Sequence, residues 1–311
     1  MSNVKTSGMI LGIIIGLIVI CTVIFLNLSN DSKEILSSDS IFISNYNHSS
    51  VSEIINSELT LQTQKVKIDN DDIYFQFYLT PRDFIRVTQQ NQDQLLDEVK
   101  IELKPEYFEK YALVKSNDNT VVIYPTFTSA AYSEPGFYTF FRSECDESCI
   151  TNLSFKNPSL GFTSSGLATQ LLYLLDYEFL TDIDVDTDPE ILKNYDTVIL
   201  LHNEYVTKKM FDAITAHPNI VYLYPNALYA EIAVNYDDNT MTLVRGHNYP
   251  EFDIYNGFDY EIEQRFHDYE YDTDCYNWEF IEFENGYALN CYPDSMLHTN
   301  LDILLKLKEL S

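Results

Sequence analysis

The sequence is poor in basic side chains. Its 311 residues contain 19 Lys and Arg against 48 Asp and Glu, which gives a formal net charge of -29. A surface this acidic repels phosphate backbones, so we expect no nucleic-acid partner. A solvated acidic surface explains the charge more simply than a specific store of cations does.

Glycine is also scarce, and none of the nine glycines belongs to a phosphate-binding motif. Gly136 and Gly161 fit neither GxGxxG nor GxxxxGK, so we interpret them as loop residues. No period of about 20 to 50 residues recurs, which argues against a solenoid or a propeller. By contrast, 24 Tyr and 19 Phe allow the chain to bury a sizeable core.

Charge is absent altogether from one long stretch, residues 9–28. At ~1.5 Å rise per residue, a helix of this length crosses the ~30 Å hydrocarbon layer of a membrane. A buried core helix and a cleaved signal peptide with Lys5 in its basic region are the alternatives. The run is long and residues 27–30 contain no small-residue cleavage site, so an uncleaved anchor is favoured.

The charges around the span predict its orientation. Lys5 precedes the apolar run and no basic cluster follows it. The cytoplasmic side of a membrane protein carries the excess of positive charge, so residues 1–8 are expected to form a cytoplasmic tail. The main domain is then extracellular, on a single-pass protein of the cell membrane.

Cysteine is also rare, and its placement agrees with export. Cys21 lies in the apolar run, whereas Cys145, Cys149, Cys275 and Cys291 form an even set outside it. Such a set can pair in an oxidising compartment, and three pairings are possible. Local pairing within 145–149 and between 275 and 291 is favoured, with a metal bound by the Cx3C loop as the alternative.

The exported chain divides by composition. Residues 29–50 are rich in Ser, Asn and Asp and are interpreted as a stalk. Residues 51–115 form a small β-containing accessory segment, with a strand predicted over Asp72–Tyr78 and a polar helix over Gln89–Val99. The α/β domain occupies residues 116–311.

Strand and helix patterns alternate in the first half of this domain. Such alternation predicts right-handed crossovers and a doubly wound, mainly parallel sheet of the flavodoxin-like kind. The expected strands are Thr120–Tyr124, Leu180–Val185, Thr197–Leu201 and Ile220–Tyr224, and the expected helices are Gly166–Leu175, Pro189–Asn194 with Asp188 as N-cap, and Thr207–Ala216 capped by Thr207.

The pattern then changes to hairpins. Glu231–Val234 and Met241–Val244 flank a polar turn, and Glu279–Glu284 and Tyr287–Cys291 flank an Asn-Gly turn. We therefore expect an antiparallel C-terminal extension of the sheet. Leu297–Leu310 has the apolar spacing of a final helix.

Chemistry is expected beyond the carboxyl ends of the parallel strands, where doubly wound sheets bind ligands. Four polar or aromatic segments follow predicted strands: residues 125–132, 202–205, 225–229 and 292–294. They are the candidate site.

Two of these segments carry a resemblance. Asp196–Tyr205, with the sequence DTVILLHNEY, and Asn219–Asn226, with the sequence NIVYLYPN, resemble the class I glutamine amidotransferase-like domain of the N,N-dimethylformamidase large subunit. The resemblance covers about residues 120–295. The chain is also similar to membrane-anchored archaeal relatives in which a Cys-Asp-Glu-Ser-Cys motif recurs.

The site departs from that of a glutamine amidotransferase, which needs a Cys nucleophile and a His to activate it. Asn226 stands near the nucleophile position, and Tyr292 stands where the family has its histidine. Glutamine hydrolysis by a Cys-His-Glu triad is therefore not expected.

The resemblance implies a different site, in which two tyrosines and one carboxylate surround a single iron. The matching positions are Tyr132, Tyr205 and Asp294, the last of them one methylene shorter than the family's glutamate. Phenolate and carboxylate oxygens suit Fe(III), which polarises an amide carbonyl and activates water. The further catalytic candidates are His202, Glu204, Asn226 and Tyr292. No organic cofactor is expected.

Two functions are thus open. The first is a membrane-anchored, metal-dependent amide hydrolase. The second is a non-catalytic cell-surface ectodomain that binds a small ligand, a glycan or an envelope partner. In the second case the site tyrosines, drawn from 24 in the chain, simply pack with their hydroxyls hydrogen-bonded.

Overall fold

A computed structural model describes residues 66–68, 74–79, 99–116, 119–155, 165–259, 272, 274–294 and 296–311. The expected cytoplasmic tail, anchor and stalk lie outside these residues, as do Gly161 and most of the helix predicted over Gln89–Val99. Within the described residues, no helix has the length and apolar character needed to cross a bilayer. The anchor therefore stays a prediction.

The centre of the fold is a six-stranded sheet with the order β12-β13-β9-β7-β4-β6. Five neighbouring strands are parallel, and β12 pairs antiparallel with β13 at the edge. The protein is therefore a mixed α/β protein, as predicted. The strands are β4 (Thr120–Tyr124), β6 (Glu178–Thr181), β7 (Thr197–Leu200), β9 (Ile220–Tyr222), β12 (Phe280–Phe283) and β13 (Gly286–Leu289).

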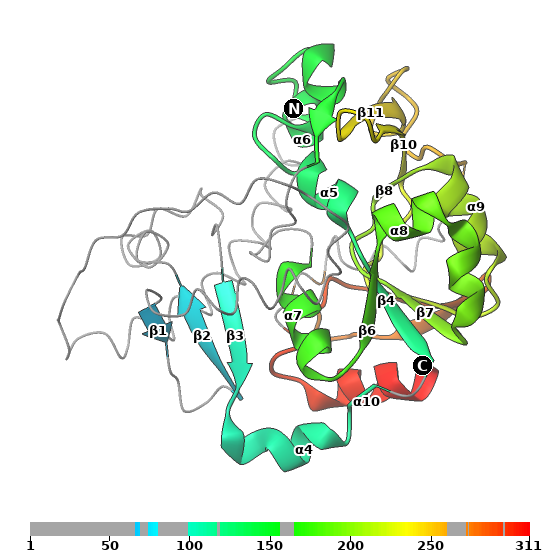
Figure 1. The fold of residues 1–311 in the computed structure, drawn as a ribbon. Coiled ribbons are helices and arrows are strands. Elements are labelled where there is room, and N and C mark those ends of the chain that lie inside the picture. The colour runs from blue at the N-terminus through cyan, green and yellow to red at the C-terminus, as the bar shows by residue number, and fades with distance from the viewer. Residues whose placement is uncertain are drawn as a thin grey trace.

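Both faces of the sheet are covered, because the strands are apolar on both sides. In β4, Val122 points into one core and Val121 and Ile123 into the other. Helices α7 (Gly166–Leu174) and α10 (Leu301–Leu310) pack on the first face, whereas α8 (Asp182–Thr187) and α9 (Lys208–Ala216) pack on the second (Figure 1). Continuous apolar strands are typical of a parallel sheet buried on both faces.

The helix ends follow local chemistry. The Thr207 side chain accepts a hydrogen bond from the Met210 N–H and so caps α9, as predicted. The Asn300 side chain accepts from the Asp302 N–H, so α10 begins at Leu301 instead of the expected Leu297. Strands β7 and β9 also end one and two residues earlier than predicted.

The strand predicted over Leu180–Val185 is wrong beyond Thr181, where helix α8 begins. The Thr181 hydroxyl accepts from the Asp184 N–H, and the Asp184 carboxylate accepts from the Thr181 N–H. This capping box starts a helix in spite of the alternating apolar residues. Residues Pro189–Asn194 form a 3-10 helix, η4, but Asp188 makes no side-chain capping bond.

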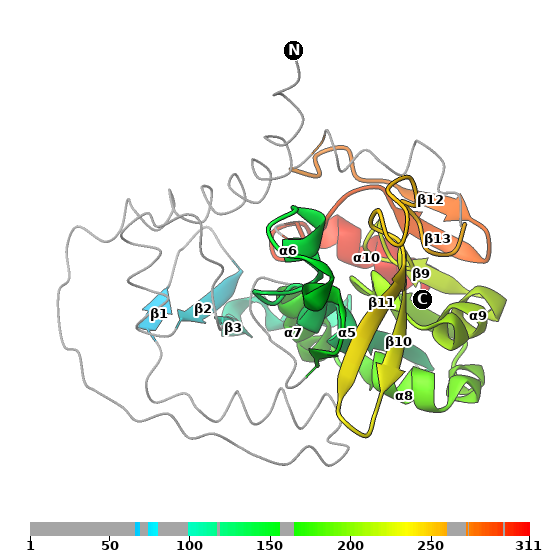
Figure 2. The same cartoon turned by 90° about the horizontal axis from the view of Figure 1, so that it is seen from above.

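A second sheet has the order β5-β11-β10-β8. The predicted hairpin forms its centre, as β10 (Ala230–Asn235) and β11 (Thr240–Arg245) pair antiparallel. The short strand β8 (Tyr205–Val206) pairs parallel with β10, and β5 (Leu153–Ser154) pairs with β11. Figure 2 shows the β10–β11 ribbon standing next to α5 (Thr126–Ala131).

The third sheet is antiparallel and precedes the α/β core in the chain. It contains β1 (Val66–Ile68), β2 (Phe75–Leu79) and β3 (Val99–Leu103), and η2 (Pro105–Tyr107) and α4 (Phe108–Ala112) follow it. The strand predicted over Asp72–Tyr78 is β2, displaced by a few residues. Phe75 and Ile101 pack into the same core as α7.

The four cysteines in the described part of the chain pair locally, as predicted. Cys145, which follows α6 (Phe137–Phe141), bonds to Cys149 within η3 (Glu147–Ile150). Cys275 bonds to Cys291, which joins the chain before β12 to the end of β13. A metal held by the Cx3C loop is therefore excluded for the bonded form.

Candidate functional site

The candidate site lies where the strand order reverses. From β4 the chain passes to β6 on one side and then to β7 on the other, so the loops after β4 and β7 diverge. Ligand crevices of open parallel sheets occur at this position, beyond the carboxyl ends of the strands. The loops after β4, β7, β9 and β13 all reach this edge because the four strands are parallel.

Glu204 is the centre of the site and is only 1% exposed. Its Oε2 accepts a hydrogen bond from the Tyr132 hydroxyl at 3.0 Å and lies 3.4 Å from His202 Nε2. Its Oε1 accepts from the Tyr138 hydroxyl at 3.2 Å and lies 2.7 Å from His247 Nε2. A buried carboxylate is costly without such partners. The site is thus arranged around one acid.

Burial and Glu204 set the protonation states around it. Burial raises the pKa of Glu204, but the charge of His247 and its hydrogen bond outweigh this and hold the pKa below its usual value. Burial lowers the pKa of His202, so this imidazole is neutral at pH 7. Burial and the Glu204 charge raise the pKa values of Tyr132, Tyr138 and Tyr205 well above 10. Glu204 is therefore an anion that lies among protonated phenols.

A short helix, α5, positions Tyr132 next to Glu204. Strand β4 ends at Tyr124, and α5 follows, with the Phe127 N–H donating to Asp182 at 2.8 Å. Tyr132 is the residue directly after α5. The hydroxyl of Thr128 in α5 also accepts from the Tyr205 N–H at 3.1 Å. The α5 helix is thus bonded to the segment that carries the second candidate phenol.

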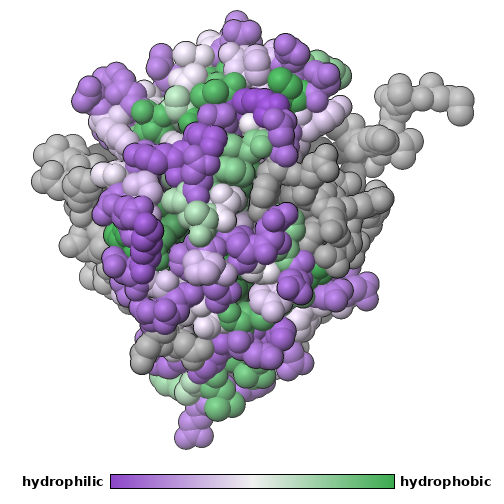
Figure 3. Space-filling view, turned by 90° about the vertical axis from the view of Figure 1, so that its right-hand side faces the viewer, coloured by the Kyte–Doolittle hydropathy of each residue, from purple (hydrophilic) through white to green (hydrophobic). Residues whose placement is uncertain are grey.

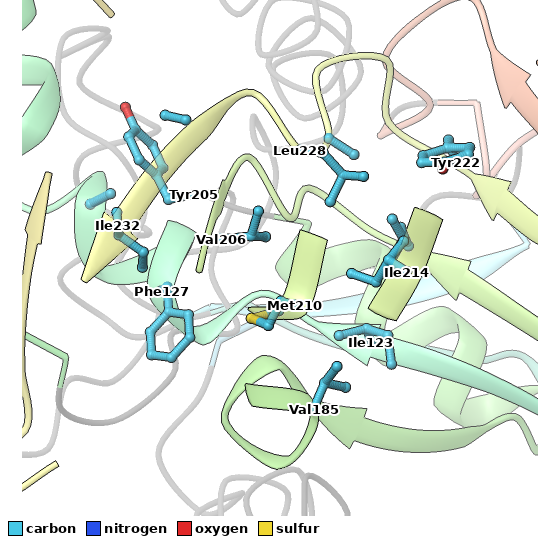
Figure 4. Close-up of a cluster of buried hydrophobic side chains, with 14 of the residues drawn as sticks. Ile123, Phe127, Val185, Tyr205, Val206, Met210, Ile214, Tyr222, Leu228 and Ile232 are labelled. Atoms are coloured by element: carbon cyan, nitrogen blue, oxygen red, sulfur yellow. The ribbon is translucent and has the colours of Figure 1, made fainter. Parts of the chain in front are cut away.

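Tyr205 lies at the edge of the apolar core with its ring fully buried. The ring stacks on His247, with centroids 5.3 Å apart and an interplanar angle of 18°. Its hydroxyl is buried and has no hydrogen-bond partner among the described residues. Figure 4 shows this hydroxyl pointing away from the other labelled side chains. An unpaired buried hydroxyl costs ~1–3 kcal/mol, so a ligand that binds it is favoured.

His202 joins two further candidates, Asn226 and Tyr292, to the cluster. Its ring stacks on Tyr224 at 5.5 Å and lies 5.7 Å from the ring of Tyr292. Asn226 lies beside His202, and its side-chain oxygen has no hydrogen-bond partner in the described part of the protein. His202, Glu204, Asn226 and Tyr292 therefore come together, although they follow three different strands.

Asp294 occupies an outer position. Its carboxylate accepts from the Tyr224 hydroxyl at 2.9 Å, and burial raises its pKa to about 6. Within the described residues, neither Tyr132 nor Tyr205 hydrogen-bonds to Asp294. The carboxylate beside the Tyr132 phenol is Glu204.

Sequence reasoning missed Tyr138 and His247. Tyr138 belongs to α6, and its hydroxyl also lies 3.0 Å from that of Tyr132. His247 follows β11 in a turn where Gly246, His247 and Asn248 have positive φ values of 116°, 53° and 65°. The glycine after a strand was the only local signal for this turn, and it does not indicate a role for the histidine.

In the described residues, no group of three or more His, Cys, Asp and Glu side chains is placed so as to hold a metal ion. The cluster also offers phenol oxygens as metal donors. Tyr132, Tyr205 and Glu204 supply hard oxygen donors, which suit Fe(III). The unpaired Tyr205 hydroxyl fits such a role.

The fold and site define a three-layer α/β protein with a tyrosine-rich acidic site at the strand ends. The family described as N,N-dimethylformamidase beta subunit-like, C-terminal, matches residues 86–268, and the chain belongs to this family. The match contains Tyr132, Glu204, Tyr205 and His247 and ends before Tyr292. No curated protein matches the chain. The predicted family resemblance is confirmed at this level.

Proposed function

We propose that the protein is a metal-dependent amide hydrolase with a degenerate class I glutamine amidotransferase-like fold. The observation that carries the proposal is the buried, unpaired hydroxyl of Tyr205 in the same cluster as the ionised Glu204. Membership of the N,N-dimethylformamidase beta subunit-like family supports amides as the substrate class.

The oxygen donors of this cluster support a bound cation. Glu204 is an anion, and its neighbours within the described residues are phenols and imidazoles, with no Lys or Arg among its hydrogen-bond partners. Tyr132 and Tyr205 would supply two ligand oxygens. Glu204 would supply the carboxylate next to the Tyr132 phenol. Asp294, the residue that the resemblance suggests, accepts a hydrogen bond from Tyr224 instead. A nearby cation lowers phenol pKa values and so opposes the effect of burial.

The other residues have roles that follow from their positions. Bound iron would polarise an amide carbonyl and activate water. The Nε2 of neutral His202 lies 3.5 Å from the Tyr132 hydroxyl, where it can exchange a proton with a substrate bound next to both. The Asn226 Oδ1, which has no partner among the described residues, can accept a hydrogen bond from the substrate.

A substitution of Tyr205 tests the proposal. We expect the purified full-length protein to contain stoichiometric iron and Tyr205→Phe to lose at least tenfold in iron affinity, by elemental analysis and chelator competition. Because the Tyr205 hydroxyl makes no hydrogen bond to any described residue, the unfolding free energy should change by less than about 0.5 kcal/mol.

The matched control is Tyr222→Phe. Its hydroxyl donates to Asn285 at 2.9 Å, outside the site, so its removal should cost about 1 kcal/mol and leave iron binding intact. If the native protein holds no stoichiometric metal and Tyr205→Phe behaves identically, the hydrolase is ruled out. The protein would then be a non-catalytic ectodomain that binds a small ligand, a glycan or an envelope partner.

We also infer that residues 9–28 anchor the protein in the cell membrane with the α/β domain outside the cell. The uncharged run itself and the two disulfides, which suit an oxidising compartment, support this placement. Residues 1–8 would remain in the cytoplasm.

A further inference from the structure

The two oxygens of Glu204 have different kinds of partner. Oε2 is next to Tyr132 and His202, which lie beside Tyr292 and Asn226. Oε1 is bonded to Tyr138 and His247, neither of which follows a strand of the parallel sheet directly. Oε2 of the carboxylate thus faces the candidate ligand residues, and Oε1 faces the two residues, Tyr138 and His247, that hold the carboxylate in place.

His247 is held firmly on that supporting side. It is 7% exposed, and four aromatic rings surround its imidazole. The Tyr205 ring stacks on it, and the other three approach with centroids at 4.7 to 5.6 Å. These three rings belong to Tyr138, Phe141 and Tyr229. With Nε2 bonded to Glu204 at 2.7 Å, the imidazole has little freedom to rotate.

The backbone that carries His247 is fixed as well. The His247 N–H donates to the Tyr255 carbonyl at 2.9 Å, and the Asn248 N–H donates to the Ile254 carbonyl at 2.8 Å. The turn is attached to the body by the Gly257 N–H, which donates to the Tyr229 carbonyl at 2.8 Å. The turn after the β10–β11 hairpin therefore holds the His247 imidazole in a fixed position, in a site whose other residues come from other elements.

We propose that His247 is a positioning residue for the site. It fixes Oε1 of Glu204 and the ring of Tyr205 together, so that Oε2 and the free Tyr205 hydroxyl are presented to the same ligand. The identity of that ligand as iron rests on the proposed function. Residues that orient metal ligands in this way typically contribute 10–100-fold to metal affinity.

Three variants of the full-length protein test this role. Iron is supplied as ferric nitrilotriacetate, and free nitrilotriacetate competes with the protein for the iron. His247→Leu removes the hydrogen bond and the stacking and should weaken iron binding by about 10–100-fold. His247→Gln keeps an N–H donor near the position of Nε2 and should recover most of this loss. The control is His217→Gln, since His217 is a buried histidine bonded to the carbonyls of Asn219 and Tyr195, away from the site.

A general effect on folding would make the two Gln variants behave alike. The proposal is overturned if the native protein binds iron and His247→Leu binds it within threefold as well. If the native protein binds no iron, the proposed function fails. The positioning role of His247 is then tested by the ring NMR signals of Tyr132 and Tyr138. Those signals should shift in His247→Leu and return in His247→Gln, and unmoved signals in His247→Leu overturn the positioning role.

Discussion

Burial and hydrogen bonding determine the protonation states of single residues in this site. Glu204 stays ionised at 1% exposure because phenol and imidazole groups donate to both its oxygens. The same burial keeps the phenols protonated and His202 neutral. The Tyr205 hydroxyl has no hydrogen-bond partner among the described residues. We propose that this hydroxyl and the Glu204 carboxylate bind a cation together.

Asp182, which lies away from Glu204, tests the effect of burial on the pKa of a carboxyl group. It is fully buried at the start of α8 and accepts from the Phe127 N–H, and burial raises its pKa from 3.8 to about 8 despite this bond. The native state therefore binds the proton more tightly than the unfolded chain does. The resulting stabilisation is complete below about pH 4 and is lost as pH rises toward 8.

The Asp182→Asn substitution should remove this dependence. The difference in unfolding free energy between native protein and variant should change by up to about 1.4 kcal/mol per pH unit between pH 5 and 8, in favour of the variant at high pH. Denaturant titrations at several pH values measure it, with exposed Asp212→Asn as control. Parallel curves for Asp182→Asn and the native protein would show that Asp182 ionises normally.

At the scale of elements, local chemistry made much of the fold predictable. Strand β4 has the predicted bounds, and both hairpins and the cap of α9 are where the sequence indicates them. Helix α8 was mistaken for a strand because its Ile and Val alternate with Asp, while the capping box at Thr181 determines the conformation. Strand β8 has only two residues and forms because β10 is beside it.

The same distinction explains the site. The four segments that hold the candidate residues were selected because strand ends in a parallel sheet meet at one edge, which the strand pattern predicts. Within these segments, the family resemblance suggested Tyr132, Tyr205 and Asp294 as ligands. His247 was missed because its contact with Glu204 spans 43 residues and depends on how a hairpin packs. Tyr138 was missed because α6 lies beyond a loop with no periodic signal. Contacts of this kind leave no trace in local sequence.

The proposed anchor, residues 9–28, can be tested directly. We expect the full-length chain to stay in the membrane pellet after alkaline carbonate washing and its domain to be cleaved by protease added to intact cells. Ile18→Arg places a charge at the centre of residues 9–28, which costs ~2.5–3.5 kcal/mol of insertion, and should release part of the protein. A native domain that resists external protease would contradict the orientation.

At the scale of the whole molecule, topology and charge act together. The reversal of strand order at β4 opens the edge where Tyr132, Glu204 and Tyr205 meet, and the hairpin sheet covers this edge with His247. One face of the molecule is strongly polar: Figure 3 shows it dominated by hydrophilic residues, with small separate hydrophobic patches. A net charge of -29 would also concentrate cations around the protein.

The central claim is that this edge binds a metal through phenol oxygens next to Glu204. Anomalous scattering at the iron absorption edge, recorded on crystals of the native protein supplied with ferric iron, tests it most directly. The account predicts one strong peak at about 2 Å from the hydroxyl oxygens of both Tyr132 and Tyr205, with a carboxylate completing the set. Crystals with no peak there, or with iron bound only elsewhere, would contradict it.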